Sequence, residues 1–185
     1  MKSDLVKFRE ILAQLPFDKY WQIGVDTGCL LKSTIIKNKY CRALEVGTSC
    51  GYSALWLIEG LSAQEKASLD CIESHKERNT LAKNNIALVC PPNVECNVHL
   101  AHAPGCFESF DRPNYDFVFV DATKSQSVAI FEALYPCLNK GGTIFIDNVL
   151  SHIEKMQPFI DYLMKNKISY KLHKIDAGLI EVKKD

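Results

Sequence analysis

The sequence predicts an α/β fold built on a mainly parallel sheet with helices on both faces. Strand-like hydrophobic runs alternate with helical patterns about every 20 to 30 residues, as in parallel strands joined by helical crossovers. A tight turn between Gly47 and Gly51 joins the first strand to its helix. Carboxylates stand at or near the carboxyl ends of four strands, the edge at which parallel sheets bind ligands: Glu45, Glu73, Asp121 and Asp147.

The first half of the chain shows this alternation after two amphipathic helices. These helices are predicted over residues 3–15 and 26–37, where apolar residues recur at helical spacing and Pro16 ends the first one. The pattern then predicts a strand over 42–46, a helix over 52–61, a strand over 67–73, a helix over 76–88 and a strand over 94–100.

The second half continues the alternation and ends in an antiparallel hairpin. We expect a short helical piece over 106–110, a strand over 115–121, a helix over 125–138 that residues 139–142 terminate, a strand over 143–147 and a helix over 154–165. Strands over 169–175 and 178–182 flank an Asp-Ala-Gly turn and complete a seven-stranded sheet. The 185 residues suit a single domain, 1–185, with 1–39 as a helical cover and 40–185 as the core.

Composition and charge argue against several classes of protein. Hydrophobic residues make up 47% of the chain, which is too many for a disordered protein. The 22 basic and 22 acidic residues balance, so binding of nucleic acid mainly through phosphate contacts is disfavoured. The eight cysteines form no C-x-x-C pair, and no apolar signal or membrane-spanning run is present. We therefore expect reduced thiols and a cytoplasmic protein that does not enter the membrane.

The strand, glycine turn and helix start over residues 42–61 form a nucleotide cradle. Glycine lets the backbone approach a ligand, and the helix N-terminus offers free N–H groups. Glu73 ends the next strand, 22 residues after Gly51, where a carboxylate accepts hydrogen bonds from a ribose diol. An ordinary solvated loop carboxylate is the alternative for Glu73, and the glycine turn upstream favours the ribose role.

Two carboxylates and an amide end two neighbouring strands: Asp121, Asp147 and Asn148. Such an oxygen-only set suits Mg²⁺ or Ca²⁺ and not zinc. Strand-end aspartates also cap the helices that follow them, but the three together favour a metal site. Lys124 lies three residues after Asp121. Beside a metal it is a candidate general base, and the alternative is a surface lysine.

Three segments carry a family resemblance. They are Leu44-Glu-Val-Gly-Thr-Ser-Cys-Gly-Tyr-Ser-Ala-Leu-Trp-Leu57, Phe119-Val-Asp-Ala-Thr-Lys124 and Gly141-Gly-Thr-Ile-Phe-Ile-Asp-Asn-Val149. In this order they resemble the motifs of the cation-dependent O-methyltransferases that use S-adenosylmethionine, the group of catechol and caffeoyl-CoA O-methyltransferases. The resemblance covers about residues 22–150. It implies a Rossmann-like methyltransferase fold and methyl transfer to a hydroxyl of a metal-chelated, catechol-like small molecule.

The resemblance also assigns roles to individual residues. It implies a divalent cation, Mg²⁺ in the first place, on Asp121, Asp147 and Asn148, and a catalytic role for Lys124, as general base, and for Asp121. It implies that S-adenosylmethionine is held by Glu45, Gly47, Thr48, Gly51, Tyr52, Ser53, Glu73, His102 and Asp121. The family usually has Gly-Asp-Ala where this chain has Ala101-His102-Ala103, so His102 takes the position expected to meet the adenine amino group.

Other readings of the sequence stay open. Small relatives also resemble enzymes that methylate a hydroxylated base in transfer RNA, which the basic C-terminal part favours and the neutral total charge disfavours. A cofactor-binding domain without turnover is motivated by His102. A nicotinamide dehydrogenase is disfavoured because the Gly-x-Gly-x-x-Gly spacing is missing. Relatives are often dimers, so the resemblance implies a homodimer acting on a small hydroxylated substrate.

Overall fold

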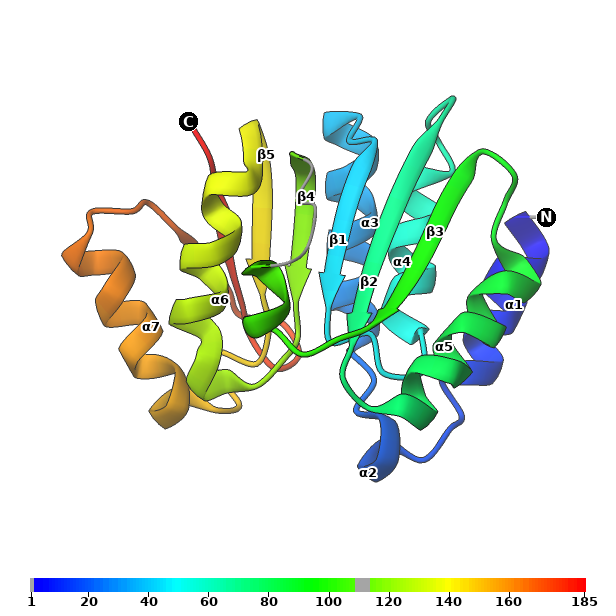
Figure 1. Ribbon diagram of the computed structural model, residues 1–185, viewed down its shortest axis with the longest axis horizontal. Helices are drawn as coiled ribbons and strands as arrows, with labels where there is room; N and C mark the ends of the chain where they lie inside the picture. The colour runs from blue at the N-terminus through cyan, green and yellow to red at the C-terminus, as the bar shows by residue number, and fades with distance from the viewer. Residues whose placement is uncertain (1, 109–113) are drawn as a thin grey trace.

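The computed structural model describes residues 2–108 and 114–185. Within these residues a seven-stranded sheet has the order β3-β2-β1-β4-β5-β7-β6 (Figure 1). Strands β1 to β5 pair in parallel, and β7 and β6 add antiparallel to the β5 side. The strands are β1 Arg42–Val46, β2 Ala67–Glu73, β3 Val94–Leu100, β4 Tyr115–Val120, β5 Leu138–Ile146, β6 Lys171–His173 and β7 Leu179–Lys183. This confirms the predicted α/β class, with its mainly parallel sheet and terminal hairpin.

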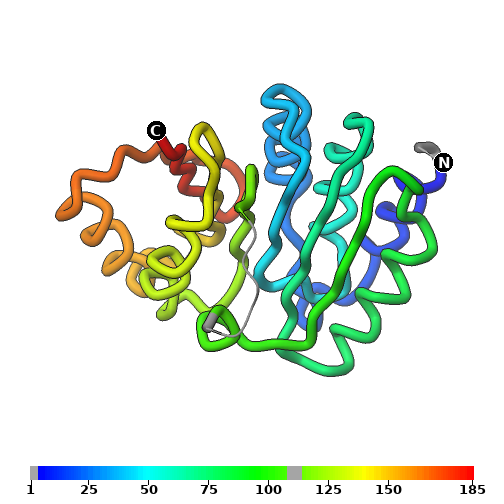
Figure 2. Tube along the Cα trace, turned by 45° about the horizontal axis from the view of Figure 1, so that its top comes forward, coloured from blue at the N-terminus to red at the C-terminus, as the bar shows by residue number. Residues whose placement is uncertain are grey.

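Helices cover both faces of this sheet. They are α1 Lys2–Leu12, α2 Phe17–Tyr20, α3 Val25–Asn38, α4 Tyr52–Leu61, α5 Lys76–Val89, α6 Ser127–Leu134 and α7 Ile153–Lys165. The two termini lie toward opposite ends of the molecule (Figures 1 and 2). In the described part of the chain, no helix has the length and apolar character needed to cross a membrane.

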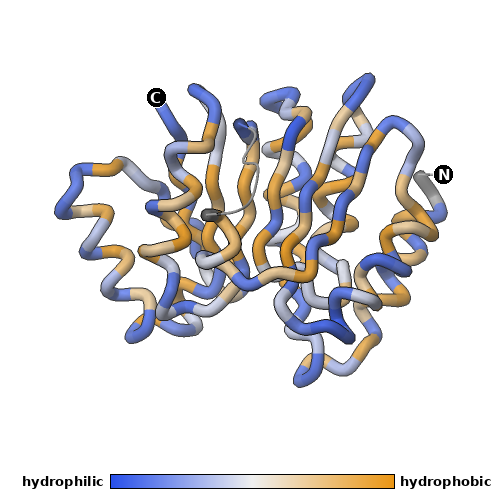
Figure 3. The backbone as a smooth tube through the Cα atoms, viewed as in Figure 1, coloured by the Kyte–Doolittle hydropathy of each residue, from blue (hydrophilic) through white to orange (hydrophobic). Residues whose placement is uncertain are grey.

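Alternating strand residues supply the two halves of the core, because successive side chains of a strand point to opposite faces. Ala43, Phe117 and Phe145 pack in one buried cluster with residues of α1, α3, α4 and α5. Their neighbours Leu44 and Val118 pack in a second cluster with residues of α6 and α7. Hydrophobic residues accordingly run along the central strands in Figure 3.

The strand register places the functional candidates at one level. Val46 pairs with Ile72 on one side and with Val120 on the other, and Val120 pairs in turn with Ile146. The residues that follow these four partners therefore meet at the carboxyl edge of the sheet: Gly47, Glu73, Asp121 and Asp147. The strand order reverses between β1 and β4, and such switch points open the crevice in which α/β proteins bind ligands.

Several predicted boundaries were wrong around β5. The helix predicted over 125–138 has its α-helical part at 127–134, because a single 3-10 turn containing Pro136 follows it. Strand β5 begins at Leu138 and not at residue 143. Gly141 and Gly142 do not stop a helix, since their backbone pairs with Lys184 at 2.7 and 2.9 Å.

Smaller differences concern the first helix and the last strands. The first helix ends at Leu12 instead of residue 15, and the separate helix α2 lies between the two helices predicted over 3–15 and 26–37. The strand predicted over 169–175 shortens to β6, which pairs only over Lys171–His173. Of the helical piece predicted over 106–110, a 3-10 helix is present at Gly105–Glu108, and residues 109 and 110 lie outside the described residues.

Candidate active site at the carboxyl edge of the sheet

A cavity of about 1000 Å³ opens at the carboxyl ends of the strands. Its wall brings together residues from the ends of β1 and β2 and residues that directly follow β4 and β5, as the register requires. Seven of the residues singled out in the sequence line it: Gly47, Glu73, His102, Asp121, Lys124, Asp147 and Asn148. His102 stands in this wall with an exposed side chain.

The turn after β1 is shaped by glycine. Gly47 has φ 97°, in the left-handed region that side chains disfavour. A Cβ atom at Gly47 would lie 2.0 Å from the carbonyl oxygen of Asp121, so the turn packs directly on the end of β4. The Gly47 N–H also donates to the Ile72 carbonyl at 2.9 Å. This part of the cavity wall is therefore bare backbone.

Glu73 is held rigidly at the end of β2. The residue is 4% exposed, and its carboxylate accepts hydrogen bonds from the backbone N–H groups of Ser49 at 2.8 Å and His75 at 2.7 Å. The Arg78 guanidinium donates to the same carboxylate at 3.3 Å. A carboxylate offers about four acceptor positions, so these three contacts leave capacity for a hydroxyl in the cavity.

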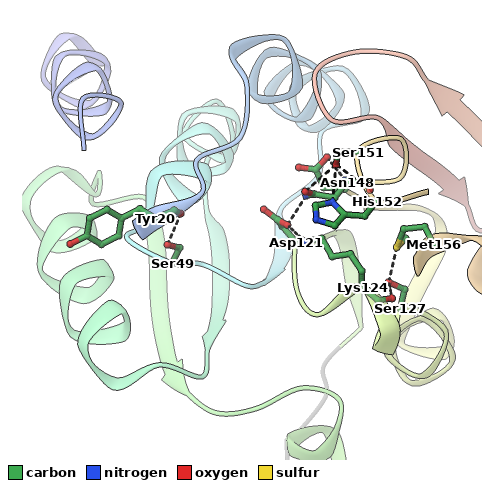
Figure 4. Close-up of polar contacts among 10 residues, drawn as sticks. Tyr20, Ser49, Asp121, Lys124, Ser127, Asn148, Ser151, His152 and Met156 are labelled. Carbon is green, nitrogen blue, oxygen red and sulfur yellow. Dashed lines mark hydrogen bonds and ion pairs between the residues drawn. The ribbon is translucent and has the colours of Figure 1, made fainter. Parts of the chain in front are cut away.

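Residues of the N-terminal segment, which the sequence predicts as a helical cover, form part of the cavity wall. Phe17 and Trp21 line the cavity although both are more than half exposed. The Arg78 guanidinium lies 5.5 Å from the centre of the Trp21 ring. Ser49 in the glycine turn donates its hydroxyl hydrogen to the Tyr20 carbonyl at 2.8 Å (Figure 4). These contacts run between distant segments and have no local sequence signal.

The three oxygen-bearing residues predicted as metal ligands do converge. The Asn148 side-chain amide and the Lys124 ammonium both donate to Asp121 Oδ1, each at 2.8 Å (Figure 4). Asp147 Oδ1 accepts the backbone N–H of Asn148 at 2.7 Å. In the described part of the chain, no group of three His, Cys, Asp or Glu side chains is arranged to hold a metal. A cation here would therefore need the amide oxygen of Asn148 as well as the two carboxylates.

The pKa of Asp147 is raised although two neighbouring groups stabilise its charged form. Burial is the largest effect and raises the pKa of Asp147 to about 7, and the nearby Asp121 and Asp176 carboxylates act in the same direction. The Asn148 N–H and the Lys124 ammonium lower this pKa. Carboxylates crowded in this way lose their mutual repulsion when a cation lies between them. The chemistry of the donor set therefore fits a hard cation.

Other predicted cofactor residues lie behind the cavity wall. The cavity lining does not include Glu45, Thr48, Gly51, Tyr52 or Ser53. The four with side chains are buried, and Glu45 is fully so. Burial raises the pKa of Glu45 to about 7, although the Ser53, Thr48 and Cys71 side chains oppose this shift. The direct cofactor contacts assigned to these five residues stay a prediction.

The turn between β6 and β7 also reaches the site. Asp176 lines the cavity and accepts the backbone N–H of Thr27 at 2.8 Å. Ala177 accepts backbone hydrogen bonds from Leu150 and Ser151, in the loop that carries Asn148. Sequence reasoning read this turn only as part of a hairpin. Nothing local in the sequence reveals that the turn bridges α3 and the loop after β5.

Two polar side chains near Asn148 were also missed. The Ser151 hydroxyl lies 3.0 Å from His152 Nδ1, and both residues line the cavity (Figure 4). They belong to the segment just before α7, in which the sequence analysis identified no functional residue.

Comparison with known proteins agrees with this geometry. A family model described as O-methyltransferase matches residues 2–179. The chain belongs to this O-methyltransferase family. The resemblance inferred from the three sequence motifs is thereby confirmed, and the family match extends beyond the motifs to α1 and β7.

Individual relatives of this family are moderately similar to the chain. A catechol O-methyltransferase of Mycobacterium tuberculosis is 30% identical over 129 residues, covering 66% of this chain and 53% of that protein. Catechol O-methyltransferase B of Danio rerio is 27% identical over 157 residues, covering 80% of this chain and 56% of that protein. The chain thus spans about half the length of these two relatives.

Solved structures share the fold. A Podospora anserina methyltransferase with bound SAH superposes with a TM-score of 0.84 at 19% identity, covering 98% of this chain and 87% of that one. At this identity the likeness concerns the fold, which is the Rossmann-like arrangement that the motif resemblance implied.

Proposed function

We propose that the protein transfers a methyl group from S-adenosylmethionine to a hydroxyl oxygen of a small, catechol-like molecule. The observation that carries this proposal is the meeting of two constellations in one cavity. The glycine turn and Glu73 form one wall, and Asp121, Asp147 and Asn148 form the other. Family membership and the names of the two catechol O-methyltransferases support the same reaction class.

The cofactor would lie along the β1 and β2 side of the cavity. The bare backbone at Gly47 allows close approach, and the remaining acceptor capacity of Glu73 suits the ribose hydroxyls. His102 would lie near the adenine. S-adenosylmethionine supplies the methyl group on a positively charged sulfur. The role of the chain is to hold this group in line with the acceptor oxygen, because alignment supplies much of the rate.

The acceptor would lie on the β4 and β5 side. The oxygens of Asp121, Asp147 and Asn148 would hold a divalent cation such as Mg²⁺, which lowers the pKa of the acceptor hydroxyl when bound. Lys124 presents its Nζ atom beside this set, and we assign to it the uptake of the hydroxyl proton. Phe17 and Trp21 offer apolar surface to an aromatic ring at the mouth of the cavity.

A methyl-transfer assay tests this function. The full chain is incubated with S-adenosylmethionine and a catechol, with Mg²⁺ or with a chelator, and the methylated product is measured by mass spectrometry. We expect product with Mg²⁺, its loss with chelator, and at least a hundredfold lower rates for Asp147→Asn and Lys124→Met. Lys83→Met, at an exposed position on α5, is the matched control and should keep the full rate.

The outcomes of this assay separate the alternatives. Turnover that ignores the chelator would remove the cation from the proposal. Cofactor binding without methylation of any offered hydroxyl would favour a binding domain without turnover.

Transfer RNA is the second candidate acceptor. Three exposed lysines near the C-terminus favour it, and they are Lys165, Lys167 and Lys171. Retention of transfer RNA at low salt, lost when these three lysines are changed to glutamine, would support that acceptor. Absence of retention at low salt would exclude it.

Two further proposals concern the protein as a whole. We infer a cytoplasmic location from the cysteines, which we expect to be reduced, and a homodimer from the motif resemblance. Light scattering during gel filtration tests the second, and a mass near 21 kDa, that of one chain, would contradict it.

A further inference from the structure

Two cysteine thiols meet at the end of the sheet opposite to the active-site cavity. Cys90 Sγ and Cys96 Sγ are 3.2 Å apart, whereas the sulfurs of a disulfide are about 2.05 Å apart. Each residue is partly exposed. Bond formation therefore requires only about 1 Å of approach from thiols that a small oxidant can reach.

The fold holds both cysteines in place. Cys90 ends α5, and its backbone N–H donates to Ile86 at 2.9 Å. Cys96 lies within β3, where it pairs with Leu69 of β2. The intervening turn is fixed because Asn93 donates its side-chain amide to backbone carbonyls at 3.2 and 2.7 Å. The thiol contact is thus a consequence of the helix-to-strand connection, and not of two mobile side chains meeting by chance.

The two thiols differ in reactivity. The contact with the Cys96 side chain lowers the pKa of Cys90, and the same contact together with burial raises the pKa of Cys96. Cys90 is therefore the better nucleophile and Cys96 the thiol that stays protonated. Cys71 lies nearby in β2 but is fully buried, and burial raises its pKa well above the ordinary value. Cys71 is accordingly a poor competitor.

We propose that Cys90 and Cys96 are an oxidation site that forms a reversible intramolecular disulfide with hydrogen peroxide. The Cys90 thiolate attacks one peroxide oxygen and becomes a sulfenic acid, while the other oxygen leaves as hydroxide and takes up a proton. The Cys96 sulfur then attacks the sulfenic sulfur, forms the S–S bond and releases a second water. The two sulfurs lose two electrons, which reduce one peroxide to two waters.

The disulfide would fasten the end of α5 to edge strand β3. Both elements also reach the cavity, through Arg78 on the first turn of α5 and through His102 beyond the far end of β3. Closing this short loop restricts the unfolded chain, so the oxidised protein should melt roughly 5 °C higher. Neither Cys90 nor Cys96 lines the cavity. Although α5 and β3 both reach it, oxidation should therefore leave ligand binding in the cavity unchanged.

Peptide mapping of the wild-type chain tests the site directly. The reduced protein is treated with hydrogen peroxide, alkylated and digested with trypsin. We expect the peptide spanning residues 84–124, since trypsin does not cleave between Arg112 and Pro113, to be alkylated at Cys106 alone. Its mass should be two hydrogens lower than that of the same singly alkylated peptide with free thiols at Cys90 and Cys96. Dithiothreitol should restore the labelling of both. Equal alkylation of Cys90 and Cys96 before and after oxidation, or a bond to any other cysteine, would overturn the proposal.

Serine variants connect the bond to stability. Cys90→Ser and Cys96→Ser should lose the rise in melting temperature on oxidation, whereas Cys29→Ser, which removes an exposed thiol on α3, should keep it. A rise of the same size in either Cys90→Ser or Cys96→Ser would contradict the assignment. Because the mapping uses the wild-type chain, it decides the question even if a variant folds poorly.

Discussion

Glu45 is a candidate cofactor residue whose side chain does not line the cavity. This carboxyl group lies in β1 with none of its surface exposed. In the described residues its Oε1 atom has no hydrogen-bond partner, and its Oε2 atom accepts a weak contact from the Cys71 thiol at 3.6 Å. Burial raises its pKa from 4.5 to about 7. The neutral form is therefore the one that the folded protein prefers over much of the acid range.

This preference predicts a pH dependence of stability that Glu45→Gln removes. Between about pH 4.5 and 7 the folded chain keeps a proton on Glu45 that the unfolded chain has lost, so stability falls as pH rises through this window. The shift in pKa corresponds to about 3 kcal/mol. We expect the unfolding free energy of wild type, measured by urea titration, to fall by this amount relative to that of Glu45→Gln between pH 4.5 and 8.

Comparison of the two proteins isolates Glu45, because Asp147 also has a raised pKa but is present in both. Stability curves that run parallel across the whole range would show that Glu45 has an ordinary pKa in the folded state. A wild-type unfolding free energy that instead rises with pH relative to Glu45→Gln would show that the neighbouring side chains outweigh burial and lower the pKa of Glu45.

At the scale of elements, the turn between β6 and β7 ties together two parts of the site. Asp176 caps the start of α3, whose own preceding residue, Gly24, offers no side-chain cap. The same turn holds the loop after β5, through the backbone bonds from Leu150 and Ser151 to Ala177. The last hairpin therefore acts as a clamp between the N-terminal helices and the residues that carry the candidate cation site.

Removing the Asp176 side chain should loosen this clamp. Asp176→Ala leaves the Thr27 N–H without its acceptor, and we expect a loss of about 1 kcal/mol in unfolding free energy. The amide of Thr27 should exchange with solvent faster, which hydrogen exchange measured by NMR would detect. Asp176→Asn keeps an acceptor oxygen and also tolerates the φ of 44° found at this position, so it should retain most of the stability.

Comparison of the two Asp176 variants shows whether the side-chain oxygen caps α3. If alanine and asparagine cost the same, the side-chain oxygen contributes nothing to capping. Unchanged exchange at Thr27 in Asp176→Ala would likewise show that α3 begins without help from the hairpin.

The sequence predicted the elements best where one local signal decides. Buried strands ending in a carboxylate, such as β4 before Asp121, were placed within a residue or two because their hydrophobic runs are continuous. The start of β5 was missed because Gly141 and Gly142 read locally as a helix stop, whereas tertiary pairing with Lys184 makes them part of the strand.

The same distinction applies to the site. Asp121, Asp147 and Asn148 could be predicted because parallel strands bring their carboxyl ends together. Arg78 and Asp176 could not, since each acts through a contact with a distant segment. For the first group, strand order and register are sufficient. For the second group, the contacts depend on the path of the connecting loops, which no local residue pattern predicts.

At the scale of the whole molecule, the cavity divides the fold between a β1–β2 side and a β4–β5 side. A ligand that spans this division contacts residues at the carboxyl ends of four strands at once. It binds the folded chain and not the unfolded one, so binding must raise the stability of the entire protein. Thermal unfolding therefore reports on cofactor binding without any assumption about the acceptor or the cation.

S-adenosylmethionine at about a hundred times its dissociation constant should stabilise the protein by about 2.7 kcal/mol, which raises the melting temperature by roughly 5 to 10 °C. Glu73→Gln should reduce this rise because it weakens the proposed acceptor for the ribose. Glu65→Gln, at an exposed position outside the active-site cavity, should not. An equal rise with NAD⁺ would indicate a site for dinucleotides in general, and no rise with either S-adenosylmethionine or S-adenosylhomocysteine would remove the cofactor from the proposed function. A rise specific to these two ligands and dependent on Glu73 would show that the Glu73 carboxylate takes part in binding the cofactor.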